Sequence, residues 1–153
     1  MSMGRLIPSD PKDVLGDYGT ALAEQSFMKV RNTSASAMAI GDVVRWDTTD
    51  ADGISVADSV AAQPVAGIVT QVVADDGYVI IQTKGINSTI ITNDGTDIVV
   101  GDLLVPGAKV AVPKIGANSE SDLLAGLVFG VALVAETGTS CAAGTVILNC
   151  FGS

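Results

Sequence analysis

The chain has 153 residues, with eight basic and 17 acidic side chains, no histidine, and a formal net charge of −9 at pH 7. A nucleic-acid-binding protein needs a basic face to neutralise phosphates, so this charge argues against that class of function. The lack of histidine excludes an imidazole general base and an imidazole metal ligand. Hydrophobic residues make up 48% of the chain but aromatic ones only 4%, which indicates a core of small aliphatic side chains.

The net charge is unevenly distributed along the chain. Residues 1–45 carry five basic and five acidic side chains, whereas residues 46–153 carry three lysines and twelve acids. A neutral first segment joined to an acidic body indicates that the two parts meet different surroundings. The plainer interpretation is solubility, because a net charge far from zero keeps proteins dispersed.

Residues 1–26 are predicted to form an extended N-terminal arm. Pro8 and Pro11 disfavour regular structure, and a helical turn over residues 20–25 is too short to be stable alone. The arm buries little by itself, so we expect it either to be disordered or to order against a neighbour. No segment is typical of a secretory signal, and no apolar run reaches the roughly 18 residues that a membrane-spanning helix needs.

Residues 27–153 are predicted to form one β domain. Residues Phe27 to Asn32 alternate apolar and polar side chains, as in a half-buried strand, and many short runs rich in valine and isoleucine follow. The predicted strands cover residues 27–32, 43–47, 54–56, 66–74, 78–83, 87–92, 103–105, 109–112, 127–135 and 145–150. The fold class is therefore all-β, a small β-barrel or β-tulip-like domain, with at most one helical turn at Leu123–Ala125.

One pattern occurs twice in this β domain. IGDVV at residues 40–44 reappears as VGDLL at 100–104, AGIV at 66–69 as FGVA at 129–132, and VIIQTKG at 79–85 as VILNCFG at 146–152. The order is kept and only the connections lengthen, as loop insertions between fixed strands produce. The sequence therefore predicts an internal two-fold pseudo-repeat, with units of about residues 38–85 and 98–152.

The Gly-Asp pairs of this repeat have two interpretations. Glycine permits a tight backbone before a strand, and aspartate accepts hydrogen bonds from nearby backbone amides, so turn chemistry explains Asp42 and Asp102. The alternative is a carboxylate pair that the two-fold repeat brings together.

Residues 47–53, DTTDADG, form the best candidate for a metal site, since a calcium loop also has acidic residues at alternating positions before a glycine. Aligning Gly53 with the loop glycine puts Thr48 at the first ligand position and Ser59 where the bidentate glutamate belongs, so both ends fail. We interpret the segment as a solvated hairpin tip, and neither a metal nor another cofactor is predicted.

Three further motifs have both a chemical and a structural interpretation. Lys84 before Gly85 is similar to the modified lysine of lipoyl-type domains, but we expect it at a strand end rather than at an exposed hairpin tip. DDGYV at 75–79 is similar to the substrate loop of trimeric dUTP pyrophosphatases, but no basic residue adjoins it to hold phosphate. Cys141 and Cys150 either face each other across the last hairpin or, as we expect, fill core sites as free thiols.

GDLLVP, VFGVALVA and AGTVIL follow one another between Gly101 and Leu148. In this order the chain resembles the small capsid decoration, or cement, proteins of tailed bacteriophages, over about residues 27–152; segments 47–65 and 117–124 do not match. The resemblance implies a protein that binds the major capsid protein on the outer surface of the assembled virion, commonly as a homo-oligomer with a trimer favoured, and stabilises the shell.

On this interpretation the arm orders on a capsid protein or on the next subunit, and the acidic face of residues 46–153 points to solvent. Trp46 shares a strand face with Val44, so we expect it to contact the core or a neighbouring subunit. The predicted capsid or subunit contacts are Arg5, Leu6, Ile7, Val14, Leu15, Tyr18 and Trp46.

Two other classes of function are open from the sequence. A head fibre or knob-like surface protein for host attachment predicts exposed aromatic residues, and a nucleotide-hydrolase-like trimeric β enzyme predicts a basic phosphate site. The few aromatic and scattered basic residues oppose both, so no catalytic residue is predicted and we expect a protein that is not an enzyme. A shell or surface-layer subunit is not separated from a cement protein by sequence.

Overall fold

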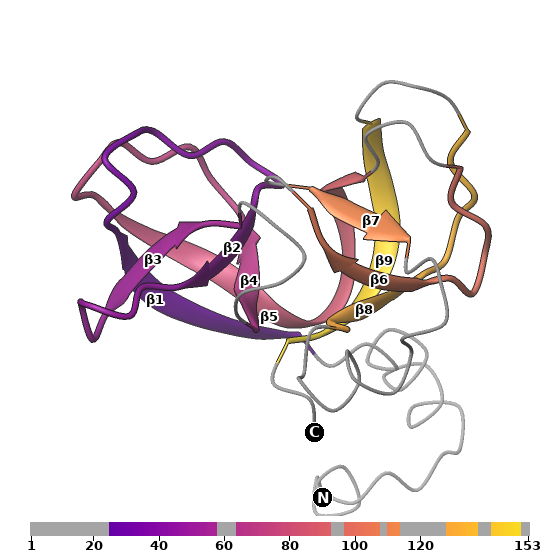
Figure 1. Ribbon diagram of the computed structural model, residues 1–153, viewed down its shortest axis with the longest axis horizontal. Helices are drawn as coiled ribbons and strands as arrows, with labels where there is room; N and C mark the ends of the chain where they lie inside the picture. The colour runs from indigo at the N-terminus through magenta and orange to yellow at the C-terminus, as the bar shows by residue number, and fades with distance from the viewer. Residues whose placement is uncertain are drawn as a thin grey trace, which may run out of the picture.

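The computed structural model describes residues 25–57, 64–92, 97–107, 110–113, 128–137 and 142–150. These residues form strands and no helix, so the protein is all-β, as the sequence predicts (Figure 1). The strands are β1 (Ser26–Asn32), β2 (Val43–Trp46), β3 (Gly53–Val56), β4 (Val65–Val69), β5 (Tyr78–Thr92), β6 (Leu103–Pro106), β7 (Ala111–Pro113), β8 (Gly130–Ala132) and β9 (Ala142–Asn149).

The strands form one sheet that closes on itself twice. Their order is β1-β3-β2-β4-β5-β7-β6-β8-β9, with additional pairings of β1 with β5 and of β5 with β9. Strands β1 to β5 therefore close a first barrel, and β5 to β9 close a second. Figure 1 shows the two barrels side by side, with the long β5 running through both. Closure leaves few exposed sheet edges, which would otherwise pair with other chains.

The shared strand corrects a sequence prediction. Residues 78–83 and 87–92 were expected as two strands with Lys84 at an end, whereas Tyr78–Thr92 is one strand of 15 residues. Its first half pairs with β1 and its second half with β9, and Lys84 has a partner in each. Gly85 has a φ of +99°, which lets the strand bend without ending where it changes partner.

Buried amide side chains support this bend. Gln82 donates hydrogen bonds from Nε2 to the carbonyl oxygens of Lys84 and Ile86, at 3.1 Å each. Asn87 donates to Gln82 Oε1 at 2.9 Å, and its own Oδ1 accepts the Ile90 N–H at 2.7 Å. Because backbone groups that leave the ladder need other partners, these two polar residues stand where the strand passes from one barrel to the other.

The first two segments of the sequence repeat occupy matched places in the two barrels. Gly41 N–H donates to the Val69 carbonyl at 2.9 Å, and Gly101 N–H donates to the Ala132 carbonyl at 2.8 Å. We call two residues matched when they hold the same place in these pairings. Since Ile68 and Val131 follow Gly67 and Gly130 in β4 and β8, they are also matched. The pseudo-repeat of whole units stays a prediction.

The third repeated segment is shifted in the structure. Ile68 pairs with Gln82, and its match Val131 pairs with Ile147, so Gln82 and Ile147 are matched. The alignment of the two repeated segments in the sequence instead matches Ile80 with Ile147. The shift is two residues, and an even shift keeps every side chain on the same face of the strand, so alternation alone does not reveal it.

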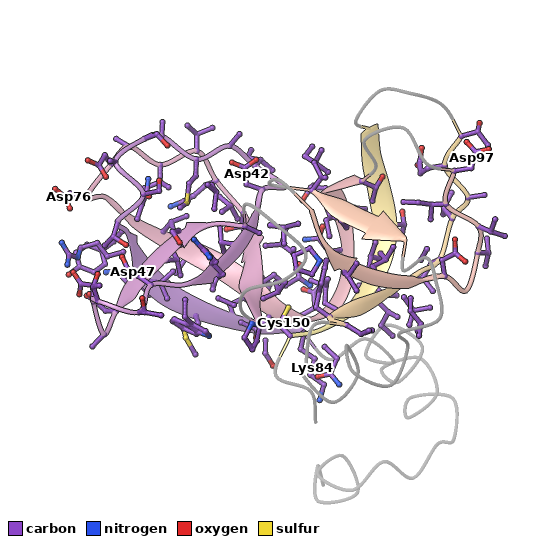
Figure 2. The ribbon with its side chains drawn as sticks, in the orientation of Figure 1. Asp42, Asp47, Asp76, Lys84, Asp97 and Cys150 are labelled. Atoms are coloured by element: carbon purple, nitrogen blue, oxygen red, sulfur yellow. The ribbon has the colours of Figure 1, made fainter. Side chains whose placement is uncertain are left out.

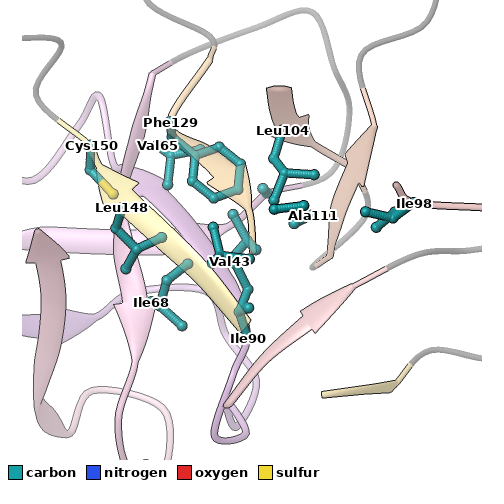
Figure 3. Packing of buried hydrophobic residues seen from close by; sticks show 13 residues of the cluster. Val43, Val65, Ile68, Ile90, Ile98, Leu104, Ala111, Phe129, Leu148 and Cys150 are labelled. Carbon is teal, nitrogen blue, oxygen red and sulfur yellow. The ribbon is translucent and has the colours of Figure 1, made fainter. Parts of the chain in front are cut away.

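The buried hydrophobic side chains form two clusters. The first lies within β1 to β5 and the loops beside them; it consists of Val30, Met38, Val44, Ile54, Ala66, Val69, Val73, Val79 and Ile81. The second joins side chains of the second barrel to Val43, Ala57, Val65 and Ile68 of the first, as Figure 3 shows. β4 is therefore buried along its whole length, with the first cluster on one face and the second on the other.

Two predicted strands are longer than the observed ones. Residues 66–74 were predicted as a strand, but β4 ends at Val69, and Val73 then makes only an isolated bridge with Met38. β8 spans only Gly130–Ala132 of the predicted 127–135. Val72, Leu133 and Val134, which lie beyond these ends, are exposed, whereas Val73 and Phe129 are buried without continuing the strands. Hydrophobicity therefore overestimated strand length. The predicted helical turn at 123–125 lies outside the described residues.

Candidate interaction surfaces

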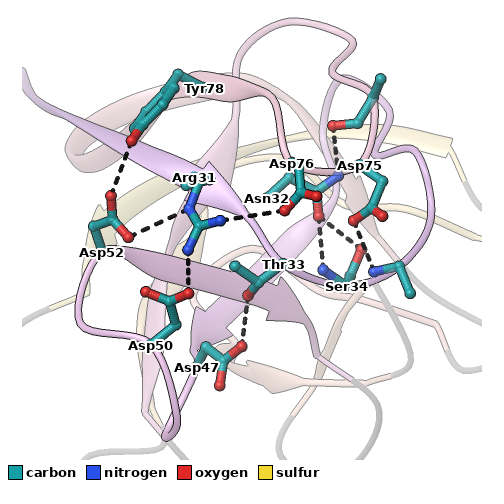
Figure 4. A network of polar contacts seen from close by, with 12 residues as sticks. Arg31, Asn32, Thr33, Ser34, Asp47, Asp50, Asp52, Asp75, Asp76 and Tyr78 are labelled. Atoms are coloured by element: carbon teal, nitrogen blue, oxygen red, sulfur yellow. Dashed lines mark hydrogen bonds and ion pairs between the residues drawn. The ribbon is translucent and has the colours of Figure 1, made fainter.

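One guanidinium group of β1 joins two loops at one end of the first barrel (Figure 4). Arg31, near the end of β1, donates to Asp50 of the β2–β3 hairpin and lies 3.5 Å from Asp52 Oδ1. It also donates from Nη1 to Asp76 Oδ1 at 3.2 Å, in the connection between β4 and β5. Tyr78 donates its hydroxyl to Asp52 at 3.3 Å, and this bond completes the cluster.

The charges of this cluster shift its pKa values. The hydrogen bond and charge of Asp50 raise the pKa of Arg31. Desolvation works to raise the pKa of Asp52, but hydrogen bonds from its neighbours and the Arg31 charge outweigh it, and the pKa is lowered. Asp47 accepts a hydrogen bond from Thr33 Oγ1 at 2.6 Å, which together with the Thr49 bonds lowers its pKa to about 2. The cluster is thus an ion-paired clamp between loops.

This clamp decides the interpretation of the candidate calcium loop. Asp50 and Asp52 face a guanidinium, and Asp47 accepts bonds from threonines, so the carboxylates of residues 47–53 do not converge on one point. Within the described ranges, no group of three or more acidic or cysteine side chains is placed to hold a metal ion. The hairpin tip is also not merely solvated, as the sequence analysis proposed, because Arg31 holds it to β1.

The same residue corrects the argument about the loop at 75–79. A basic residue does adjoin it in space, because Arg31 reaches Asp76. Its guanidinium is neutralised by carboxylates, which makes it a poor phosphate ligand. Asp76 has a φ of +59°, and Asp75 accepts the Ala35 N–H at 3.0 Å. These features hold the turn, and they account for its Asp-Asp-Gly sequence.

The two repeated aspartates have the structural role that the sequence favours. Asp42 accepts the Ala39 N–H at 2.9 Å, and Asp102 accepts the Val99 N–H at 2.8 Å. Each carboxylate thus closes the turn before its own strand. Asp42 is buried and Asp102 half-buried.

Three other candidate residues have defined positions. Lys84 is exposed in the middle of β5, at the lower edge of the ribbon between the two barrels in Figure 2, and not at a hairpin tip. Cys150 is a free, buried thiol in the second cluster, and burial raises its pKa to about 12. Trp46 packs half-buried against the first cluster. Cys141 lies outside the described residues.

The predicted arm cannot be compared with the structure, since residues 1–24 lie outside the described ranges. This applies to Arg5, Leu6, Ile7, Val14, Leu15 and Tyr18, whose contact with a capsid or subunit stays a prediction. The same holds for the interface role of Trp46. Ser26 rather than Phe27 begins the first strand, and Gln25 precedes it.

The second barrel carries a loop pair that the sequence analysis missed. Residues 98–101 and 132–136 run antiparallel, joined by the Gly101–Ala132 bond and a bridge between Ile98 and Glu136. Four large apolar side chains between these points are exposed; they are Val99 (60%), Val100 (61%), Leu133 (38%) and Val134 (47%). We call these four residues the apolar loop pair. Figure 2 shows the neighbouring Asp97 at the far end of the molecule from the Arg31 clamp.

The fold does not require Leu133 and Val134 to be apolar, because polar residues stand at their matched positions in the first barrel. At the matched positions the first barrel has Ala39, Ile40, Thr70 and Gln71, and its turn makes the same backbone hydrogen bonds. Acidic residues Asp97, Asp102 and Glu136 flank the apolar loop pair in the chain. Contiguous exposed apolar side chains with a charged rim are typical of protein–protein contact sites. The signal in the sequence was the unbroken run LVA after β8, which was assigned to a strand.

Comparison with known proteins identifies the fold. No family model matches the chain, and no curated protein matches it. Among solved structures it is similar to the N base of the head fibre protein gp8.5 of bacteriophage phi29, with a TM-score of 0.54 and 18% sequence identity. The match covers 82% of this chain and 94% of that one, so the shared architecture extends over most of both. In the part of the chain that the structure describes, no helix is long and apolar enough to cross a membrane.

Proposed function

We propose that this protein is a non-catalytic structural component of a bacteriophage head, placed on the outer surface of the virion. The observation that carries the proposal is the fold shared with a phage head fibre base over most of both chains. The sequence independently resembles phage capsid decoration proteins, and the described polar clusters hold loops together. The fold and the sequence resemblance both support a phage head protein, and the absence of catalysis is part of the proposal.

The specific role that we propose is decoration, in which the protein binds the major capsid protein of the assembled shell and stabilises it. The apolar loop pair is the surface that we propose for this contact, because it is exposed and because Leu133 and Val134 have polar residues at their matched places in the first barrel. Its acidic flanks, Asp97, Asp102 and Glu136, favour a capsid surface with a basic rim. Arg5, Leu6 and Ile7 of the arm are proposed to add to this contact, and the protein to act as a homo-oligomer, a trimer being favoured.

A second candidate is the base of a head fibre. The solved structure that this chain resembles has that role in its own phage, so the fold suits it equally. Both roles require binding to an assembled head. They differ in whether the side of the protein that faces away from the head holds a further segment. A decoration protein stabilises the shell by itself, whereas a fibre base also presents a further segment for host attachment.

The test is co-sedimentation of the purified full chain with expanded shells that lack it, beside unexpanded procapsids and free capsid subunits. Decoration predicts saturable binding to expanded shells and greater resistance of those shells to heat. Binding without a gain in heat resistance would favour the fibre base. No binding to any form would overturn both candidates.

A further inference from the structure

A row of apolar side chains crosses four strands on the outer face of the second barrel. Leu103 of β6 pairs with Val131 of β8, Val131 pairs with Ile147 of β9, and Ile147 pairs with Ile86 of β5. Residues directly opposite in antiparallel strands point to the same side, so the four side chains lie in line. Leu103, Ile86 and Ile147 are each more than a third exposed, and Val131 is half-buried.

Three of the four side chains in the matched row on the first barrel are buried, and the fourth, Phe27, is 52% exposed. The row consists of Val43, Ile68, Gln82 and Phe27, by the same pairings. Val43 and Ile68 are fully buried, because they pack into the cluster of the second barrel. The second barrel therefore covers most of this row on the first barrel. The matching row on the second barrel is not covered by any described residue.

The N-terminal segment joins β1 beside the uncovered row. Gln25 donates its side-chain amide to the Ile86 carbonyl at 3.4 Å, and Ser26 pairs with Lys84. The chain before Gln25 thus begins at one end of the row. Adjacent strands lie about 4.8 Å apart, so the row is roughly 14 Å long. Eleven extended residues span up to about 36 Å, which is ample for residues 14–24 to cross it.

The composition of residues 14–24 suits this face. Val14, Leu15, Tyr18 and Leu22 are apolar, and Leu22 is only three residues from Gln25. Lys84 is exposed two residues before Ile86, and the segment supplies Asp17 and Glu24 as charge partners. We propose that residues 14–24 of each chain bind over the row Leu103–Val131–Ile147–Ile86 of the same chain. This contact within the chain replaces the predicted capsid or subunit contacts of Val14, Leu15 and Tyr18, and residues 1–13 remain available to a partner.

The proposal is tested by cross-linking in the full chain. With Cys141→Ser as background, Leu22→Cys is combined with Ile147→Cys and treated with a short bis-maleimide. Cys150 stays in place because it is buried and unreactive. We expect a cross-link within one chain, with a yield that does not change on dilution. The matched control combines Leu22→Cys with Ile80→Cys, which is equally exposed on the first barrel and should cross-link poorly.

Three cross-linking results would overturn the proposal. Cross-links only between chains would show that a second copy covers the row. Equal yields at Ile80 and Ile147, or no cross-link at all, would show that the segment does not bind there. An independent readout uses the full chain with Tyr18→Ser and Leu22→Ser, which should bind more of the dye ANS; adding Ile147→Thr should cancel the gain. An unchanged dye signal would also contradict the proposal.

Discussion

The two barrels use the same turn for different purposes. In both, a glycine with positive φ precedes an aspartate that accepts a backbone N–H, and the two turns make matching hydrogen bonds. The first turn lies against the shared strand, since Gly41 is buried and accepts the Ile91 N–H at 3.1 Å, whereas Gly101 of the second turn is exposed. The comparison shows that the Gly-Asp pair is needed by the turn itself, whereas the residues around it differ with what the turn packs against.

The glycines of the two turns should give the largest difference. A Cβ on Gly41 would lie 2.0 Å from the Thr89 carbonyl oxygen, while one on Gly101 would meet nothing within 4 Å. Both glycines have positive φ, which costs another residue about 1–2 kcal/mol. We expect Gly101→Ala to lower the free energy of unfolding by that amount, and Gly41→Ala by about 3 kcal/mol or more because backbone must also move. Urea unfolding measures both, and equal losses would contradict the comparison.

A matched pair in the sheet should show the next largest difference. Ile68 is fully buried between the barrels, and its match Val131 is half-buried on the outer face. We expect Ile68→Ala to cost about 3 kcal/mol of stability, through lost burial and a cavity, and Val131→Ala about 1 kcal/mol or less. Thermal unfolding of the two variants checks this. A larger loss for Val131→Ala than for Ile68→Ala would contradict the comparison.

The two aspartates should differ less. Asp42 is buried, so Asp42→Ala leaves the Ala39 N–H without a partner and should cost about 2 kcal/mol. Asp102 is half-buried, and water can replace its bond to Val99, so Asp102→Ala should cost about 1 kcal/mol or less. Denaturant titrations of the single variants compare them. If the order is reversed, local burial does not set the strength of these caps.

The smallest predicted effect concerns pH and the clamp of the first barrel. The pKa of Asp47 is about 2 in the folded protein, below its ordinary value of 3.8, mainly because Thr33 donates to it. A lowered folded-state pKa gives stability that is present above pH 4 and is lost as the pH falls toward 2. Thr33→Val should raise the Asp47 pKa toward its ordinary value, as NMR titration would measure. An unchanged pKa would mean that the threonine is not the cause.

Local patterns in the sequence predicted much of this structure. Alternation located β1, and the Gly-Asp segments predicted two turns whose hydrogen bonds match. The continuous β5 was missed because Lys84-Gly85 is a strand end by local rules, while the pairings with β1 and β9 that continue it come from distant sequence. Arg31 gave no signal, since its carboxylate partners are 19 to 45 residues away.

The apolar loop pair was missed for a different reason. An unbroken apolar run is typical of a buried strand, and the sequence does not say that Leu133 and Val134 lie beyond the end of β8. Only the comparison with Thr70 and Gln71, at the matched places in the first barrel, shows that these apolar residues are not needed by the turn.

The most direct test of the account transfers the surface of one barrel to the other. A triple variant gives the second turn the residues that the first barrel has at matched positions, by Val99→Ala, Leu133→Thr and Val134→Gln. The control is Val72→Thr, at an exposed residue of the first barrel. We predict that the triple variant unfolds at nearly the wild-type denaturant concentration but loses most of its co-sedimentation with expanded phage shells, while the control binds normally. Undiminished binding by the folded triple variant would contradict the claim that the second barrel carries the contact surface.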